Sequence, residues 1–447
     1  MKSGPLLFLA LVAAVPAGAQ VPAAPAPVPR LSAPAAPAQL TLADALKRAL
    51  AANPGLGRSR ADVNAAQSQV NVAFSSILPH IGFKGSYTRN DREVSFGSGN
   101  DAVTILPYND WSYRFTLSQP IYAGNRERKA LQQARLSVDS FRQGLRGAED
   151  QLILSVTSDY LAVLEAEDLL AVEAKNLTLA QHRRDQAQVF FDAGETTRVD
   201  VLRAEADTKG AERRVASARQ TREAAVGRLR LDLAMEGPIE VTAPGNLFPA
   251  LPAENDLTAA AEANRPEVAQ ALAALESARL EVQKQKNARL PLVTADGAWI
   301  QQRSAFPTDK YAQLSLNFSV PIFDSGEIKG KVAIAEDRRQ QAELTVQEVR
   351  QSVREQVHQA LVDLQTAEAN LRLSTEQLAA SEAESNQATE LYRAQELTAL
   401  EAQQAETSLA DARRTVANSK LDRDVAELRV WAAAGTLKKI VPLEGVQ

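Results

Sequence analysis

Two kinds of hydrophobic periodicity alternate along the chain. Apolar or aromatic side chains occur at every second position around residues 80–90 and 110–120, and again around 292–301 and 311–320. This is the period of a β-strand. The clearest alternation is that of Trp111, Tyr113, Phe115 and Leu117. A polar loop separates the strands of each pair, so the pattern predicts two β-hairpins whose loops differ in length.

Each predicted hairpin is followed by a very long helical pattern. The stretches 126–191 and 328–392 contain no proline, and at about 1.5 Å per residue each predicts a helix on the order of 100 Å long. Their apolar residues step by threes and fours, as in the seam of a coiled coil. The seam positions are Val346, Val349, Val353, Val357, Ala360, Leu364, Ala367 and Leu371, and in the first stretch Leu145, Ala148, Leu152, Val156, Asp159, Val163, Ala166 and Leu170. Shorter helices are predicted over 198–235 and 398–434, after turns near Gly194 and Gln395.

The chain is an internal tandem repeat. A Ser-x-Pro-Ile-aromatic motif occurs at Pro120 and at Pro321, 201 residues apart (321 − 120), and a Leu-Pro pair occurs at Pro79 and at Pro291, 212 apart (291 − 79). Repeats at a fixed separation indicate a duplicated structural unit. We therefore expect a first repeat over 40–240, a linker over 241–255, a second repeat over 256–436 and a C-terminal tail over 437–447.

The N-terminus carries an export signal. Lys2 precedes an apolar run from Leu6 to Val15, and small residues follow at Ala17 and Ala19, which predicts a signal peptide over 1–19. The alternative, an N-terminal anchor, is disfavoured because the run is too short to span a bilayer of about 30 Å as a helix. Residues 20–39 are rich in Ala and Pro and are expected to form an extended tether.

The composition changes the picture chiefly by exclusion. The chain has no cysteine, which rules out disulfides, thiolate metal sites and a lipid anchor on cysteine, and its 50 basic and 55 acidic residues form no basic block that would favour nucleic acid. The three histidines are dispersed and a Gly-x-Ser-x-Gly elbow is missing. The string from Gly326 to Val332 has the wrong spacing for a phosphate-binding loop. We therefore expect neither an enzyme nor a cofactor or metal site.

Four strands in one chain are too few for a closed barrel. Open strand edges leave backbone groups unpaired, which a bilayer does not tolerate, and the smallest single-chain barrels have about eight strands. Several copies must therefore join their strands, with the long helices packed side by side as a continuing tube. The sequence predicts an oligomeric tunnel.

The tandem order of helix, Leu-Pro, strand, loop, strand, Ser-x-Pro-Ile-aromatic motif, long helix and helical hairpin resembles the TolC-like family of outer-membrane efflux proteins, over essentially all of Leu40 to Gly435. The resemblance implies a mainly α fold with a small membrane β-barrel contribution, in which a homotrimer forms a twelve-stranded barrel and an α-helical tunnel. It places 236–255 and 441–447 in an equatorial belt.

The resemblance also implies a function. The protein would be the passive exit duct of a tripartite efflux or type I secretion system in the outer membrane of a Gram-negative type bacterium, with a large periplasmic extension. Its partners would be outer-membrane lipid, a periplasmic adaptor (membrane fusion) protein and an inner-membrane transporter driven by protons or ATP. A periplasmic adaptor or a structural coiled-coil protein stays open as the alternative.

Site residues are implied only by the resemblance. In the family, acidic residues and a tyrosine–arginine pair close the periplasmic end, and the gate candidates at the matching positions are Asp200, Tyr392, Glu401 and Gln404. Gln404 stands in place of the second ring acid and Leu397 in place of the arginine, departures that argue against a tightly locked, doubly acidic gate. For Asp200 and Glu401, a solvated acid on a helix face is the competing interpretation. The tips of the helical hairpins are candidate adaptor contacts, namely Gly194, Thr197, Gln395 and Thr398.

Overall fold

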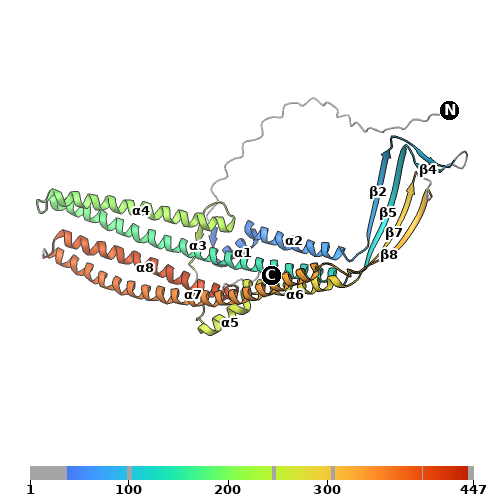
Figure 1. The fold of residues 1–447 in the computed structure, drawn as a ribbon. Coiled ribbons are helices and arrows are strands. Elements are labelled where there is room, and N and C mark those ends of the chain that lie inside the picture. Colours follow the sequence, from blue (N-terminus) through green and yellow to red (C-terminus); the bar gives the residue numbers. More distant parts are fainter. Residues whose placement is uncertain (1–37, 98–102, 244–247, 304–307, 395, 441–447) are drawn as a thin grey trace, which may run out of the picture.

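The protein is a long rod with a sheet at one end and two helical tips at the other (Figure 1). The computed structural model describes residues 38–97, 103–243, 248–303, 308–394 and 396–440. The predicted signal peptide, nearly all of the tether, Gln395 and the stretch 441–447 lie outside these residues.

The helices occur in two matching sets. The first set is α1 (Leu42–Ala52), α2 (Pro54–Ser75), α3 (Arg126–Asp192) and α4 (Arg198–Leu233), and the second is α5 (Glu254–Asn264), α6 (Pro266–Lys286), α7 (Glu327–Arg393) and α8 (Ala399–Ala433). Both α3 and α7 have 67 residues, which makes each about 100 Å long. A short helix, α9 (Leu437–Ile440), follows α8.

Proline fixes the same break in both repeats. α2 and α6 each begin with a proline, which is tolerated there because the first N–H groups of a helix lack an internal partner. Pro54 and Pro266 lie 212 residues apart (266 − 54), as do the two Leu-Pro pairs. Each repeat therefore enters its long helix through the same short helix, break and second helix.

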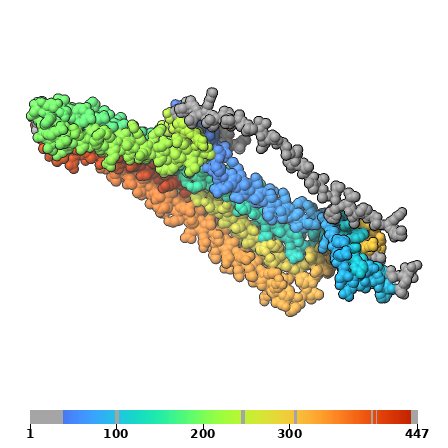
Figure 2. All heavy atoms as spheres, turned by 90° about the horizontal axis from the view of Figure 1, so that it is seen from above, coloured from blue at the N-terminus to red at the C-terminus, as the bar shows by residue number. Residues whose placement is uncertain are grey.

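The helices pack as two side-by-side layers of the rod. α2 and α4 follow one another along α3, α6 and α8 do the same along α7, and α3 also contacts α6 and α8, which joins the two repeats (Figures 1 and 2). The predicted seam forms this core: Val156 and Val163 of α3 and Val353 and Val357 of α7 are all buried. Burial of this apolar stripe, more than helix propensity, stabilises such long helices.

The four long strands form one antiparallel sheet in the order β2 (His80–Arg89), β5 (Asn109–Tyr122), β7 (Leu292–Gln302), β8 (Lys310–Ser319). The β5–β7 pairing brings the two hairpins together, with Phe115 opposite Trp299. Within the described residues, β2 and β8 each pair with a single strand and form the sheet edges. The fold class is confirmed as a mainly helical tandem repeat with two hairpins and long antiparallel helices.

Two small sheets were not predicted. β3 (Val94–Phe96) and β4 (Val103–Leu106) extend the first hairpin beyond the main sheet, and β1 (Ala38–Leu40) pairs in parallel with β6 (Ile239–Val241). The second of these lies against the middle of α3, where the buried hydroxyl group of Tyr160 accepts a hydrogen bond from Thr242 N at 3.0 Å and lies 2.9 Å from Leu40 O.

The main sheet has one apolar face and one polar face. Side chains alternate between faces along a strand, and the register aligns Ile81 with Leu117 and Gly297 with Leu314 on the apolar face. Leu314 is 87% exposed. The aromatic rings of Phe83, Phe115 and Trp299 contact one another across three strands on this face. A wide exposed apolar surface of this kind marks a site of interaction with another apolar phase.

Candidate functional site

The first candidate site is the pair of helical tips farthest from the sheet. α3 ends at Asp192 and is followed by Gly194, whose φ of 77° is a conformation that glycine adopts without strain. The N–H of Glu195 donates to Phe190 O at 2.8 Å, and in the second repeat the N–H of Glu396 donates to Leu391 O at 2.9 Å. Both tips thus share an equivalent backbone hydrogen bond.

Both predicted gate acids lie in the first turn of a helix. The Asp200 carboxylate accepts hydrogen bonds from the hydroxyl groups of Thr197 at 2.6 Å and Thr196 at 2.8 Å, and the Glu401 carboxylate accepts one from the Thr398 hydroxyl at 2.6 Å. Each acid and its threonine form a capping box. These hydrogen bonds lower the pKa of both Asp200 and Glu401. The acids are therefore ionised at neutral pH, and a local structural role is now the clearer one for each.

The other two gate candidates are not joined to these acids. Tyr392 makes no hydrogen bond to Asp200 among the described residues, and it lies instead near Arg183 of α3. Burial lowers the pKa of Arg183, an effect that Asp207 and Tyr392 partly offset. Gln404 is exposed on α8. Within one chain, the arginine whose pKa Tyr392 influences therefore belongs to the first repeat.

A set of polar contacts that the sequence reasoning missed lies below the tips. These contacts hold α8 against the first helical hairpin, which is formed by α3 and α4. Gln403 Nε2 donates to Asp207 Oδ2 at 2.6 Å, and Arg183 forms an ion pair with Glu406. Burial raises the pKa of Asp207, although the nearby arginines oppose this effect. These contacts run between repeats, so they depend on how α8 lies on α3 and α4.

The most buried of these contacts is the inter-hairpin ion cluster of Glu173, Arg214 and Arg414. The Glu173 side chain is 3% exposed and pairs with Arg414 of α8 at 2.6 Å and with Arg214 of α4 at 3.4 Å. Glu173 follows Leu170 by three residues and so continues the apolar seam. A charge at that position was the signal that could have indicated the cluster.

A second acidic group at the same interface lies closer to the middle of the rod. Burial, together with the neighbouring carboxylates of Asp422 and Asp168, raises the pKa of Glu165 to about 6 from an ordinary 4.5. The folded protein binds the Glu165 proton more tightly than the unfolded chain does. At low pH, protonated Glu165 therefore contributes to the stability of the folded state. That contribution is lost as the pH rises through about 6.

Glu165→Gln is therefore expected to stabilise the protein at pH 8, because the amide mimics the protonated acid. The gain should disappear near pH 4.5, where the parent carboxyl is itself protonated. Thermal unfolding at the two pH values measures this difference. Glu167→Gln is the matched control, because Glu167 forms an ion pair with Arg222 at 2.7 Å. Loss of this ion pair should leave the stability at pH 8 unchanged or lower it. An equal shift at both pH values for Glu165→Gln would contradict the assignment.

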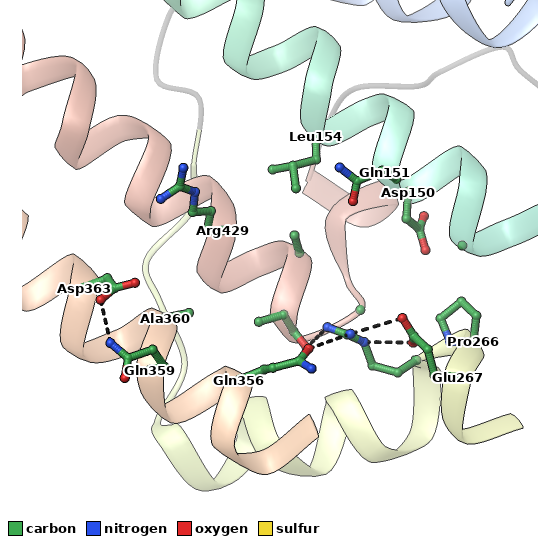
Figure 3. A pocket seen from close by; sticks show the side chains of 15 residues that line it. Asp150, Gln151, Leu154, Pro266, Glu267, Gln356, Gln359, Ala360, Asp363 and Arg429 are labelled. Atoms are coloured by element: carbon green, nitrogen blue, oxygen red, sulfur yellow. Dashed lines mark hydrogen bonds and ion pairs between the residues drawn. The ribbon is translucent and has the colours of Figure 1, made fainter. Parts of the chain in front are cut away.

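Another candidate is a cavity of about 370 Å³ where α3, α6, α7 and α8 meet (Figure 3). Arg265 Nε donates to Glu267 at 3.1 Å and Nη2 donates to Gln356 at 2.8 Å. Burial raises the pKa of Asp150, against the opposing charge of Lys438. Because these charged groups are largely partnered by one another, the cavity is better explained as a helix junction than as a ligand site.

The described part of the chain offers little other chemistry. It contains no cluster of three or more His, Cys, Asp or Glu that could hold a metal ion. In the same residues, every helix is too short or too polar to cross a membrane.

The family model described as "Outer membrane efflux protein" matches this chain twice, over residues 45–234 and 257–436. The chain belongs to the outer membrane efflux protein family. It is 25% identical over 415 residues to the outer membrane efflux protein BepC of Brucella suis, a match that covers 89% of this chain and 86% of BepC. It is 23% identical over 424 residues to the outer membrane protein TolC of Escherichia coli, covering 88% of this chain and 82% of TolC.

A solved structure supports the same fold. The structure of CusC superimposes with a TM-score of 0.77 at 19% identity, covering 88% of this chain and 92% of CusC. The family match confirms the predicted family, the outer-membrane location and the function as an efflux channel subunit. The alternative of an adaptor or a purely structural coiled coil is set aside, because the family match covers both repeats.

Proposed function

We propose that three copies of this chain close into a continuous passive duct, in which the sheets form a twelve-stranded barrel in outer-membrane lipid and the helices form a periplasmic tunnel. The observation that carries the proposal is the four-stranded sheet with an exposed apolar face and two edges, β2 and β8. The strands alternate in direction, so β8 of one copy can lie antiparallel to β2 of the next. Closure in this way would pair the backbone groups that a bilayer cannot satisfy.

The duct would work by conduction and not by catalysis. An inner-membrane transporter, driven by protons or ATP, would supply the energy, and a periplasmic adaptor would contact the tips near Gly194, Thr197, Gln395 and Thr398. Structural work on the similar protein CusC describes transmembrane channel formation, which supports a channel role here. The double family match also supports the proposed division into repeats over 40–240 and 256–436, with a linker over 241–255.

The tips would form the closed end of the resting channel. Asp200, Tyr392, Glu401 and Gln404 all lie in the last turns before the tips or the first turns after them. The contacts of Gln403, Glu406 and Arg414 with the first hairpin would keep α8 in place. Opening would then require those contacts to break, which an adaptor bound at the tips could favour.

Disulfide cross-linking across the sheet edges tests the trimer directly, because the parent chain has no cysteine. Ser86→Cys in β2 would be combined in turn with Gln313→Cys, Ser315→Cys or Asn317→Cys in β8, since closure fixes one register. At least one pair is expected to give covalent species of two and three chains on a non-reducing gel.

In the control, Ser112→Cys takes the place of Ser86→Cys and is combined with the same three β8 cysteines. Ser112 lies in the interior strand β5 and not at a sheet edge. This control should give no cross-linked chains. The trimeric closure would be overturned if all three edge pairs gave only monomers in membranes. It would also be overturned by cross-linked species of more than three chains.

A further inference from the structure

The polar face of the main sheet carries two basic side chains in direct opposition. Lys84 of β2 and Arg114 of β5 are register partners, so their Cβ atoms are about 5 Å apart on the same face. Both side chains are exposed. Like charges directly opposite each other destabilise a strand pair, so this arrangement has a cost that needs an explanation.

Among the described residues of this face, no neighbour offsets the two charges. The same cross-strand row continues with Ile300 and Tyr311, neither of which is a carboxylate. Among the described residues, neither Lys84 nor Arg114 forms an ion pair or a side-chain hydrogen bond. We refer to Lys84 and Arg114 as the basic pair.

The acids on the polar face are too distant to neutralise the basic pair. Asp110 lies four residues before Arg114 along β5, and Asp296 is the register partner of Ser118, four residues after it. Four residues of strand span about 13 Å, which is more than the Debye length of about 8 Å at physiological ionic strength.

Asp296 also has partners of its own. Its carboxylate accepts hydrogen bonds from the Ser118 hydroxyl at 2.5 Å and the Asn317 amide at 2.6 Å. It lies nearer the helical end of the sheet than the basic pair, so cargo leaving the helical tunnel would pass the acid first and the basic pair second.

We infer that the basic pair is a binding site for multivalent oxyanions inside the channel, such as phosphate, carboxylate or sulfonate groups carried by the cargo. The inference rests on the proposed function, because the apolar face must contact lipid for the polar face to line the lumen. Three chains would then place six positive charges in one ring. A narrow passage with low-dielectric walls concentrates the field of such a ring and raises the local concentration of anions.

The arginine makes the site suited to oxyanions in particular. A guanidinium group offers a planar set of donors that matches two oxygens of a phosphate or carboxylate, while an ammonium group adds a compact charge. Since the two side chains project from adjacent strands, one multivalent anion can contact both. Its binding would also relieve their mutual repulsion.

The test uses the whole protein in a planar bilayer, with pyrophosphate added only to the side of the sheet loops. We expect pyrophosphate to block single-channel current in the parent, and the double variant Lys84→Gln/Arg114→Gln to need at least about tenfold more for the same block. A factor of ten corresponds to 1.4 kcal/mol. The two single variants should lie between the parent and the double variant.

The matched control is Arg89→Gln/Lys310→Gln, which removes the same number of charges from β2 and β8 but from the opposite face of the sheet. The pyrophosphate concentration that blocks this control should stay within about twofold of the concentration that blocks the parent. Open channels that pyrophosphate does not block in the parent, or blocks equally in the parent and the double variant, would overturn the inference and leave the duct intact. A membrane-inserted oligomer without any current would overturn the proposed duct and the site together.

Discussion

Arg414→Ala is expected to loosen α8 from the first hairpin and to increase the conductance of the channel. The substitution leaves the buried carboxylate of Glu173 with only the longer contact to Arg214. Removing one partner of a buried ion pair costs about 3 kcal/mol or more, because the remaining charge is uncompensated. Although burial alone would lower the pKa of Arg414, its hydrogen bond to Glu173 and the charge of that carboxylate raise it, which indicates a favourable pair.

Thermal unfolding and single-channel recording measure the two consequences. Arg413→Ala is the matched control, because the neighbouring Arg413 pairs with Glu382 of α7 within the same hairpin and both side chains are at least 35% exposed. Such exposed pairs contribute about 0–1 kcal/mol, and this one does not hold α8 to α3. Equal effects of the two substitutions on stability and current would show that the inter-hairpin ion cluster has no special role.

Tyr160→Ala is expected to destabilise the middle of the rod by about 3–5 kcal/mol, in the range for truncating a buried aromatic residue. The ring is fully buried, and its hydroxyl group joins both strands of the β1–β6 sheet to α3 through Leu40 and Thr242. Tyr160→Phe should cost less, about 1–3 kcal/mol, because it only leaves the Thr242 N–H and the nearby carbonyls without this partner.

Chemical unfolding combined with limited proteolysis around residues 236–243 would measure this effect, since release of β6 exposes its backbone. Tyr87→Phe provides the control: this exposed tyrosine donates its hydroxyl hydrogen to Asn109 Oδ1 at 2.9 Å, so its loss should be close to neutral. If Tyr160→Phe is as mild as Tyr87→Phe, the hydroxyl contacts do not hold the two strands.

The elements that follow local patterns were the predictable ones. The helix expected over 126–191 corresponds to α3 at Arg126–Asp192, because its seam steps from Leu152 to Val156 and Val163 at the helical period. Trp111 to Leu117 lie in β5 because their alternation is equally local. By contrast, the β1–β6 pairing joins three-residue strands about two hundred positions apart, for which no local pattern exists.

The candidate site was predicted less well than the fold. Family resemblance located the tips, but the roles of Asp200 and Glu401 follow from a pattern that was overlooked, a threonine three residues before an acid at a helix start. Glu173 could have been found as a charge on the apolar seam. Its partners Arg214 and Arg414 could not, because only the packing of α8 on α3 and α4 brings them together.

The most direct test of a passive duct is single-channel recording from the purified, membrane-inserted protein in a planar bilayer, without pump or adaptor. The account predicts discrete, long-lived unitary currents in the parent that become larger in Arg414→Ala and stay unchanged in Arg413→Ala. A correctly folded and inserted trimer that passes no current in the parent or in Arg414→Ala would contradict it.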